Sequence, residues 1–192
     1  MKFIALTKSD KHGGYCVAGL DENGNKIRLV STEKGGALDD ECFSYAVPTM
    51  LEVEAEPVPL KNQPENYLLK SIARELPLDF EKLKPKIFTD NKKYGKLFVN
   101  TKEYLTEWSI YKTKWSLAFI EVSDLSLSRN SNGHYKAKFT YNGDKYKNVS
   151  VTDPKYESAG DIGKAYLVVS LPNNPYFWDK RFYKFIAAIY PK

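Results

Sequence analysis

Residues 14–31 read GYCVAGLDENGNKIRLVS and predict a β-hairpin. Asn23-Gly24 lies between two short apolar runs, Tyr15–Gly19 and Lys26–Ser31, and both turn residues tolerate a positive φ. An earlier apolar run, Phe3–Thr7, adds a further strand in front of this hairpin. The chain therefore opens with three predicted strands.

The same strand pattern continues through most of the chain. In Thr49–Glu56 acidic and apolar residues alternate with a period of two, which indicates a half-buried strand. In the second half the predicted strands are Trp115–Val122 joined to Leu125–Ser128, Tyr135–Tyr141, Lys145–Val151, Ala165–Leu171 and Tyr183–Tyr190. Asn142-Gly143-Asp144 makes the middle pair a second hairpin. Short strands in each half predict a mostly β chain of two small barrels.

One segment of the first half has a helical spacing. Within Glu65–Phe88, apolar residues recur at intervals of three and four, and Pro77 ends the pattern. The residues are Leu68, Leu69, Ile72, Ala73 and Leu76. A further helical turn is predicted at Asp79–Leu83. The polar stretch Thr89–Lys96 is the best candidate for a linker between two domains. We therefore expect one domain over residues 1–96, with a helical insert, and another over residues 97–192.

The composition is that of an ordinary globular protein, with 192 residues, of which 42% are hydrophobic and 28% charged. No apolar run reaches the length of a membrane span, and the N-terminus lacks a signal-peptide core. Cys16 and Cys42 are too few for a disulfide scaffold or a zinc site, so we expect reduced thiols in a cytoplasmic protein. We expect no metal and no cofactor.

The net charge of +5 is confined to the second half of the chain. Residues 101–192 hold 14 Lys and Arg against 9 Asp and Glu, whereas the first 100 residues are balanced. The second half also holds 18 of the 27 aromatic residues, including every tryptophan. The two halves are therefore expected to have different functions.

Catalytic motifs are not recognisable in this sequence. His12 and His134 each lie in a polar turn that contains glycine, so we interpret both as surface residues. The chain has no phosphate-binding loop, no dinucleotide fingerprint and no His-Glu-x-x-His helix. Cys16 could present a reactive thiolate, but a structural role as a small buried residue of a strand is the simpler interpretation. The sequence identifies no reaction.

Four lysines of the second hairpin alternate with aromatic residues. Lys136, Lys138, Lys145 and Lys147 could neutralise phosphates, and neighbouring aromatic rings could stack on the bases of a single strand. Alternation places Tyr135, Phe139 and Tyr141 opposite the charged face, which favours a core role for these rings. The four lysines themselves could either bind a ligand or form a solvated surface.

Three consecutive aromatic residues occur in a predicted loop. Pro175–Phe182 places Tyr176, Phe177 and Trp178 beside two cations. Loops at barrel rims often hold ligand contacts, and large exposed rings are costly unless they are packed or used. Phe177 and Trp178 could therefore bind nucleic acid or a protein partner, or they could close the end of the barrel.

Several short stretches together resemble one family. They are Gly14–Gly19, Lys26–Ser31, Gln63–Asn66, Thr152–Pro154, and Tyr183-Lys184 before an apolar strand. With these stretches, which span nearly its whole length, the chain resembles the prokaryotic dual OB-containing domain. The resemblance implies two OB-like barrels in tandem, with a suspected role in binding nucleic acid or a nucleotide.

The resemblance also implies a set of ligand-binding residues. These are Arg28, Ser31, Gln63, Glu65, Asn66, Thr152, Asp153 and Lys184. Arg28 offers a planar fork to a phosphate or a base edge, and Asn66 can both donate and accept. Glu65 and Asp153 would repel phosphate, so they would hold a cation in place or read a base amino group. Turn and capping roles remain alternatives for Asp153 and for Glu65 and Asn66. Ile27 replaces a tryptophan that the family often has before the arginine.

We therefore expect a non-enzymatic module that binds single-stranded nucleic acid or a nucleotide, with no membrane partner. An enzyme acting on such a ligand and a protein-interaction adaptor are the alternatives.

Overall fold

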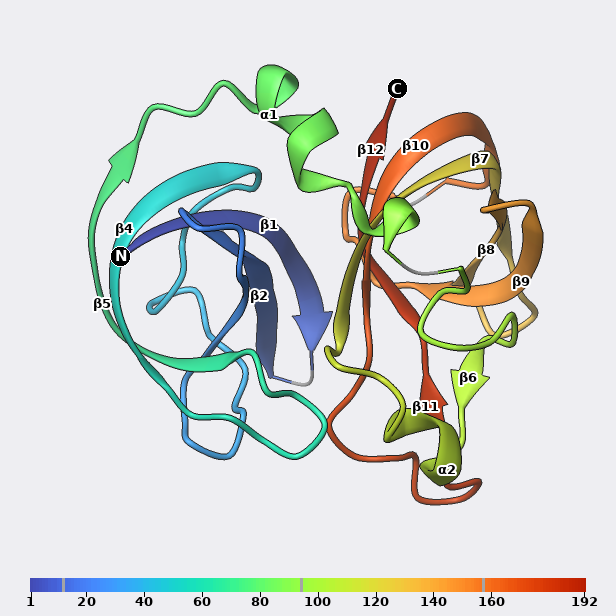
Figure 1. Cartoon of the computed structure of the whole chain (residues 1–192), viewed down its shortest axis with the longest axis horizontal. Coiled ribbons are helices and arrows are strands. Elements are labelled where there is room, and N and C mark those ends of the chain that lie inside the picture. The colour runs from blue at the N-terminus through green and yellow to red at the C-terminus, as the bar shows by residue number, and fades with distance from the viewer. Residues whose placement is uncertain (12, 94, 157) are drawn as a thin grey trace. The chain divides into compact units, whose positions relative to one another are not determined.

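The computed structural model describes residues 1–192 except His12, Tyr94 and Glu157. The interpretation of His12 as a surface residue lies outside the described residues. Contacts divide the chain into two units, Met1–Ile87 and Phe88–Lys192, and we describe each by itself. Each unit is built around one closed five-stranded barrel (Figure 1).

The first barrel has the strand order β1-β2-β3-β5-β4. Its strands are β1 (Lys2–Lys11), β2 (Gly14–Asp21), β3 (Lys26–Val30), β4 (Thr49–Pro57) and β5 (Asn66–Leu76), and the helix α1 (Phe80–Ile87) follows. All neighbouring strands are antiparallel except β3 and β5, which pair in parallel. Phe3, Ile27, Phe43 and Leu51 are among the fully buried residues of its core.

The second barrel repeats this strand order as β7-β8-β9-β12-β10. Its strands are β7 (Leu117–Arg129), β8 (Tyr135–Tyr141), β9 (Asp144–Val151), β10 (Gly160–Ser170) and β12 (Phe185–Pro191). The parallel pair is β9 with β12, in the place of β3 with β5. Both barrels thus have the five-stranded, closed arrangement of an OB fold, as expected.

Short elements outside the barrel strands complete the second unit. They are the 3₁₀ helix η1 (Asp90–Lys92), β6 (Tyr104–Leu105), α2 (Glu107–Ile110) and β11 (Phe182–Tyr183). Asp90 and Asn91 hold the segment after α1 on β7, because their side chains accept the backbone N–H of Phe119 (2.8 Å) and Glu121 (2.7 Å). These bonds group η1, which lies in the expected linker, with the second barrel.

Both hairpins form as the sequence predicts. The β2–β3 turn has Gly24 at φ 79°, and the β8–β9 turn has Asn142 and Gly143 at φ 50° and 85°. Phe139 and Tyr141 point into the barrel, as the alternation of β8 requires, and Tyr146 of β9 stacks on Phe139. Much of the aromatic content of the second half is therefore core.

The helix predicted from Leu68 to Leu76 is wrong, because these residues form β5. Two register shifts against β4 explain the misleading spacing. Ile72 and Arg74 are two residues apart in β5 but pair with adjacent residues of β4, and the same holds for Leu69 and Ser71. Each bulge adds one residue and breaks the period of two. Leu69 and Ile72 consequently both pack on the core although they lie three residues apart. Among the described residues of the first unit, the helix is α1, which follows the barrel strands and continues past Pro85.

Candidate functional site

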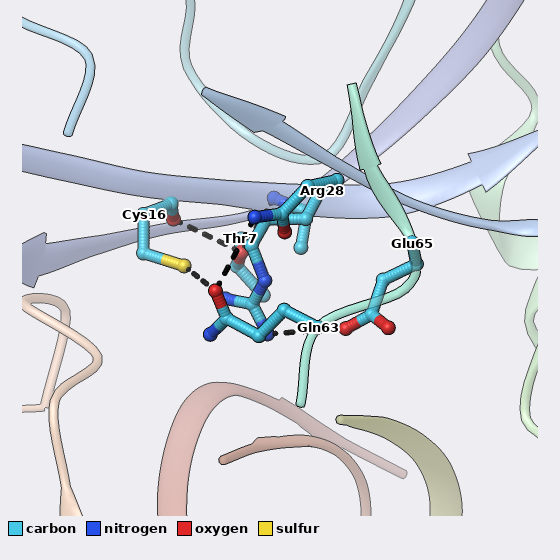
Figure 2. A network of polar contacts seen from close by, with 7 residues as sticks. Thr7, Cys16, Arg28, Gln63 and Glu65 are labelled. Atoms are coloured by element: carbon cyan, nitrogen blue, oxygen red, sulfur yellow. Dashed lines mark hydrogen bonds and ion pairs between the residues drawn. The ribbon is translucent and has the colours of Figure 1, made fainter. Parts of the chain in front are cut away.

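In the first barrel, a buried ion pair lies where the parallel strands meet. Arg28 of β3 is the register partner of Asn66, and its backbone N–H donates to the carbonyl of Glu65 (2.8 Å). The Arg28 guanidinium Nη2 lies 3.5 Å from Oε1 of Glu65, and both side chains are almost completely buried (Figure 2). A buried pair of this kind is costly to break, because either charge would remain without its partner.

The second neighbour of this guanidinium is Cys16 of β2. Arg28 Nη1 donates to Cys16 Sγ at 2.7 Å (Figure 2). Burial alone would lower the pKa of Arg28, but the Cys16 sulfur and the Glu65 carboxylate outweigh burial and raise this pKa. Thr7 of β1 continues the network, because its hydroxyl donates to the Cys16 carbonyl (3.2 Å) and accepts the N–H of Ala18 (2.9 Å). One arginine thus connects β2, β3 and the residue before β5.

Gln63 and Asn66 lie in the same buried region. The Asn66 amide donates to Oε1 of Gln63 at 3.4 Å, and both residues are buried. Within the described residues, Oδ1 of Asn66 is a buried acceptor with no hydrogen-bond donor. A Cβ on Gly35 would come within 3.4 Å of the Asn66 amide nitrogen, so the loop after β3 packs closely here.

Ser31 differs from the other predicted residues of this barrel, because it is exposed. Its backbone N–H donates to the Gly36 carbonyl (3.1 Å), which closes the loop after β3. The structure therefore brings Arg28, Gln63 and Glu65 together beneath the surface, with Ser31 at the start of the adjoining loop. The buried members hold the β4–β5 loop, residues 58–65, against the barrel.

In the second barrel, Lys184 takes the position that Glu65 has in the first. Each residue directly precedes the first paired residue of the parallel ladder, Phe185 and Asn66 respectively. Lys184 is fully buried, and its Nζ donates to the backbone carbonyl (2.8 Å) and to Oδ1 (3.0 Å) of Asn100. Burial lowers the pKa of Lys184 to about 7, although Glu103 opposes the shift.

Thr152 and Asp153 connect the end of β9 to β12. Oδ2 of Asp153 accepts the N–H of Ile189 (2.8 Å), and Oδ1 accepts the N–H of Lys155 (3.0 Å). Burial raises the pKa of Asp153 despite these two bonds. The Thr152 N–H donates to the carbonyl of Ile186 (2.9 Å). These two residues thus complete the contacts between β9 and β12.

The four lysines of the second hairpin lie on the outer side of β8 and β9, and we call them the lysine face. Lys138, Lys145 and Lys147 are exposed. Lys136 is half-buried and donates to the Ser150 hydroxyl (2.7 Å); burial lowers its pKa, and Glu103 opposes this. Glu103 directly precedes β6, so the Lys136 end of the face lies near the short β6–β11 sheet.

The predicted aromatic loop lies between β10 and β11, at residues 171–181. Phe177 and Trp178 are each 81% exposed. The loop is nevertheless closed by backbone bonds, from the Tyr176 N–H to the Arg181 carbonyl and from the Lys180 N–H to the Tyr176 carbonyl, both 2.9 Å. Its rings are therefore held outward rather than packed into the end of the barrel.

Two further exposed rings were not expected from the sequence. Trp108 and Tyr111, on and directly after α2, are 86% and 60% exposed. The local signal for this short helix is Thr106 followed three residues later by Ser109, whose hydroxyl accepts the Thr106 N–H (2.7 Å). That pattern indicates where a helix begins but not which of its side chains face solvent.

Other expected features can be compared with the described part of the chain. His134 is exposed, as its position in a polar turn predicts. No three His, Cys, Asp or Glu residues with described positions gather closely enough to hold a metal ion. None of the described helices is long and apolar enough to cross a membrane.

Comparison with known families gives a match over nearly the whole chain. A family model described as the dual OB-containing domain matches residues 1–189 of the chain. No curated protein and no solved structure matches.

Proposed function

Because the chain belongs to the dual OB-containing domain family, we propose that its second barrel binds nucleic acid along the outer side of β8 and β9. The observation that carries this proposal is the position of the lysine face. OB folds bind oligonucleotides with the face of their second and third strands and with the loops between strands one and two and between strands four and five. In the order of the second barrel, β8 and β9 are those two strands.

The charges of the lysine face suit a phosphate backbone. Lys138, Lys145 and Lys147 are exposed on two paired strands, and no described acidic side chain forms an ion pair with them. Protein cations that neutralise phosphates release counterions, which makes binding steeply dependent on salt. The excess of positive charge in the second half of the chain would strengthen the first encounter with such a ligand.

The loop with Phe177 and Trp178 connects the fourth strand of the second barrel to β11, just before the fifth strand. It therefore corresponds to a loop that OB folds use for ligands. In the first barrel the equivalent loop is residues 58–65, which ends at Glu65. We assign Arg28, Gln63, Glu65 and Asn66 a positioning role toward that loop, with exposed Ser31 as the member able to touch a ligand.

In the second barrel, we assign the same kind of role to Thr152, Asp153 and Lys184. Their side chains bond to backbone groups or to Asn100, and Asp153 and Lys184 are buried. They would act by holding β12 and the segment before β6 in place. Direct ligand contact is assigned to Lys136, Lys138, Lys145, Lys147, Phe177 and Trp178.

The test is a salt titration of oligonucleotide binding. Fluorescence anisotropy with a labelled 15-nucleotide single strand would be measured between about 50 and 200 mM salt, where phosphate contacts have their largest effect. The variant K138E/K145E/K147E is expected to bind at least tenfold more weakly. Its slope of log affinity against log salt should be smaller by about 2, since each phosphate contact on a single strand contributes ~0.7.

The matched control is K2E/K82E/K86E, which changes the net charge equally at three exposed lysines of the first unit. It should retain the wild-type salt slope. If the two triple variants bind equally well, the lysine face is not the interface. Gel electrophoresis of the same strand after incubation tests the enzymatic alternative, which predicts a change in its length or mobility.

A further inference from the structure

Most of the large exposed apolar side chains lie on two segments of the second unit. In the described part of the chain they are Met1, Val99, Trp108, Tyr111, Tyr176, Phe177 and Trp178. Five of these seven are aromatic and belong either to α2 and the residue after it or to the β10–β11 loop. Exposed rings gathered in this way mark an interaction site more often than chance exposure does.

The two segments are joined to each other. β6, which precedes α2, pairs with β11, which follows the loop (Figure 1). Beneath them, Leu105 and Ile110 form a small buried cluster with Leu171 and Phe182. Because Ile110 is buried in this cluster, the one-turn helix has a fixed orientation, and Trp108 is directed away from the barrel. The exposed rings thus stand on a packed base.

A series of ring contacts runs from the loop to β6. The ring centroids of Trp178 and Tyr176 are 6.5 Å apart, those of Tyr176 and Tyr183 are 5.3 Å apart, and those of Tyr183 and Tyr104 are 5.9 Å apart. These spacings lie within the range of favourable aromatic pairs. The rings therefore support one another and would lose little conformational entropy on binding a ligand.

Cations accompany these rings. The Arg181 guanidinium lies 4.1 Å from the Tyr104 ring centroid, and Lys180 Nζ lies 5.0 Å from that of Phe177. Lys102 Nζ lies 5.6 Å from the Tyr104 centroid. The nearby carboxylates include Glu103 and the exposed Glu107. They also include the half-buried Asp179, which accepts the Tyr183 hydroxyl (2.6 Å). Flat rings among cations suit a polyanion with stackable bases better than an apolar protein surface.

We infer that Trp108, Tyr111, Phe177 and Trp178 form a base-stacking surface, the aromatic patch, which selects single-stranded over double-stranded nucleic acid. This inference rests on the proposed function, because the lysine face would bind the backbone of the same strand. Bases stack on aromatic side chains only when they are not stacked within a duplex. Trp108 and Tyr111 extend the interface to a segment that precedes the first strand of the barrel.

The experiment compares Trp108→Leu with Trp108→Phe. Both remove the indole, but only phenylalanine keeps a flat aromatic face. Because Trp108 is 86% exposed, both variants should keep the wild-type circular dichroism and melting temperature. Binding of a labelled single strand, its duplex, and an abasic strand of equal length would be measured by anisotropy, with F177A/W178A as a second variant.

Trp108→Leu and F177A/W178A are each expected to bind the single strand at least fivefold more weakly, while Trp108→Phe stays within twofold of wild type. The abasic strand should bind all four proteins about equally, since it keeps the phosphates but lacks the bases. The duplex should bind wild type more weakly than the single strand does.

Three results would overturn the inference in different ways. If Trp108→Leu binds the intact strand as tightly as wild type, and K138E/K145E/K147E is still impaired, the stacking surface is refuted while the proposed function stands. If wild type binds none of the three ligands, both fail. Loss of a co-purifying protein from Trp108→Leu, without any strand binding to wild type, would reassign the patch to a protein partner.

Discussion

The two barrels share a strand order but satisfy a buried charge in different ways. At the residue before the parallel ladder, the first barrel has Glu65, which faces Arg28 on the neighbouring strand. The second has Lys184, which donates to Asn100, a residue outside the barrel strands. In the first barrel, both members of the ion pair therefore belong to the barrel strands or to the loops that connect them. The second barrel instead uses its buried amino group to hold the segment that leads to β6 and α2.

This difference indicates how one topology can serve two purposes. In the first barrel the polar cluster stabilises its own loops, whereas in the second the corresponding residue positions added structure. The backbone N–H of Lys184 also donates to the Glu103 carbonyl (2.8 Å), so the residue holds that segment at two points. The exposed rings of the second unit therefore depend on a residue that is itself fully buried.

The largest expected effect comes from removing the arginine of the first barrel. Arg28→Met leaves Glu65 buried without its cation, which should cost about 3–5 kcal/mol. Every tryptophan lies in the second half of the chain, so tryptophan fluorescence reports the second barrel while far-UV circular dichroism reports both. In urea, the dichroism should show an early transition that the fluorescence lacks.

A matched control for this variant is Arg74→Met, also in the first barrel. Arg74 forms an exposed pair with Glu52 (2.7 Å), and such pairs contribute at most about 1 kcal/mol. An equal loss of stability in both arginine variants would contradict the distinction between the buried and the exposed pair.

The next effect concerns pH and the second barrel. The pKa of Lys184 falls from 10.5 to about 7 on folding, so between these values the unfolded chain binds a proton that the folded chain does not. The stability of the second barrel should therefore rise with pH across this window, by at most about 1.4 kcal/mol per pH unit, and fall as pH drops toward 7.

Lys184→Met removes this titration, so its stability should change less between pH 7 and 9.5 than that of wild type. The measurement is the urea midpoint of tryptophan fluorescence at several pH values. Parallel curves for the two proteins would show that Lys184 does not titrate in this window.

A smaller effect is expected at the contact between β9 and β12. Asp153→Ala deprives the N–H groups of Ile189 and Lys155 of their acceptor, at a cost of about 1–3 kcal/mol in the second barrel. Asp161→Ala, at an exposed position of β10, is the control and should be nearly neutral. If Asp153→Ala has the same stability as wild type when measured by tryptophan fluorescence, these two hydrogen bonds do not stabilise the second barrel.

The strands of both barrels were largely predictable from local patterns. Asn-Gly turns and alternating residues depend only on neighbours in sequence, so both hairpins and the inward side of β8 followed from them. β5 was not predictable in this way, because its two bulges are set by pairing with β4. A strand with two extra residues imitates the spacing of a helix, and the sequence does not contain the register that distinguishes them.

The candidate site was predictable only in part. The lysine face follows from alternation, and the exposure of Phe177 and Trp178 agrees with a loop that contains proline. The burial of Arg28 depends on a contact with Glu65, which is 37 positions away in the sequence. The burial of Lys184 depends on a contact with Asn100, which is 84 positions away. Trp108 was missed because its direction is set by the burial of Ile110 in the cluster with Leu105, Leu171 and Phe182.

The small β6–β11 sheet has a consequence for self-association. Both barrels are closed, so in the described part of the chain each barrel strand has a neighbour on both sides. β6 and β11 contain only two residues each, which is too short to template an intermolecular sheet. The large exposed aromatic side chains of the second unit therefore stand beside strands that present little unpaired backbone to another chain.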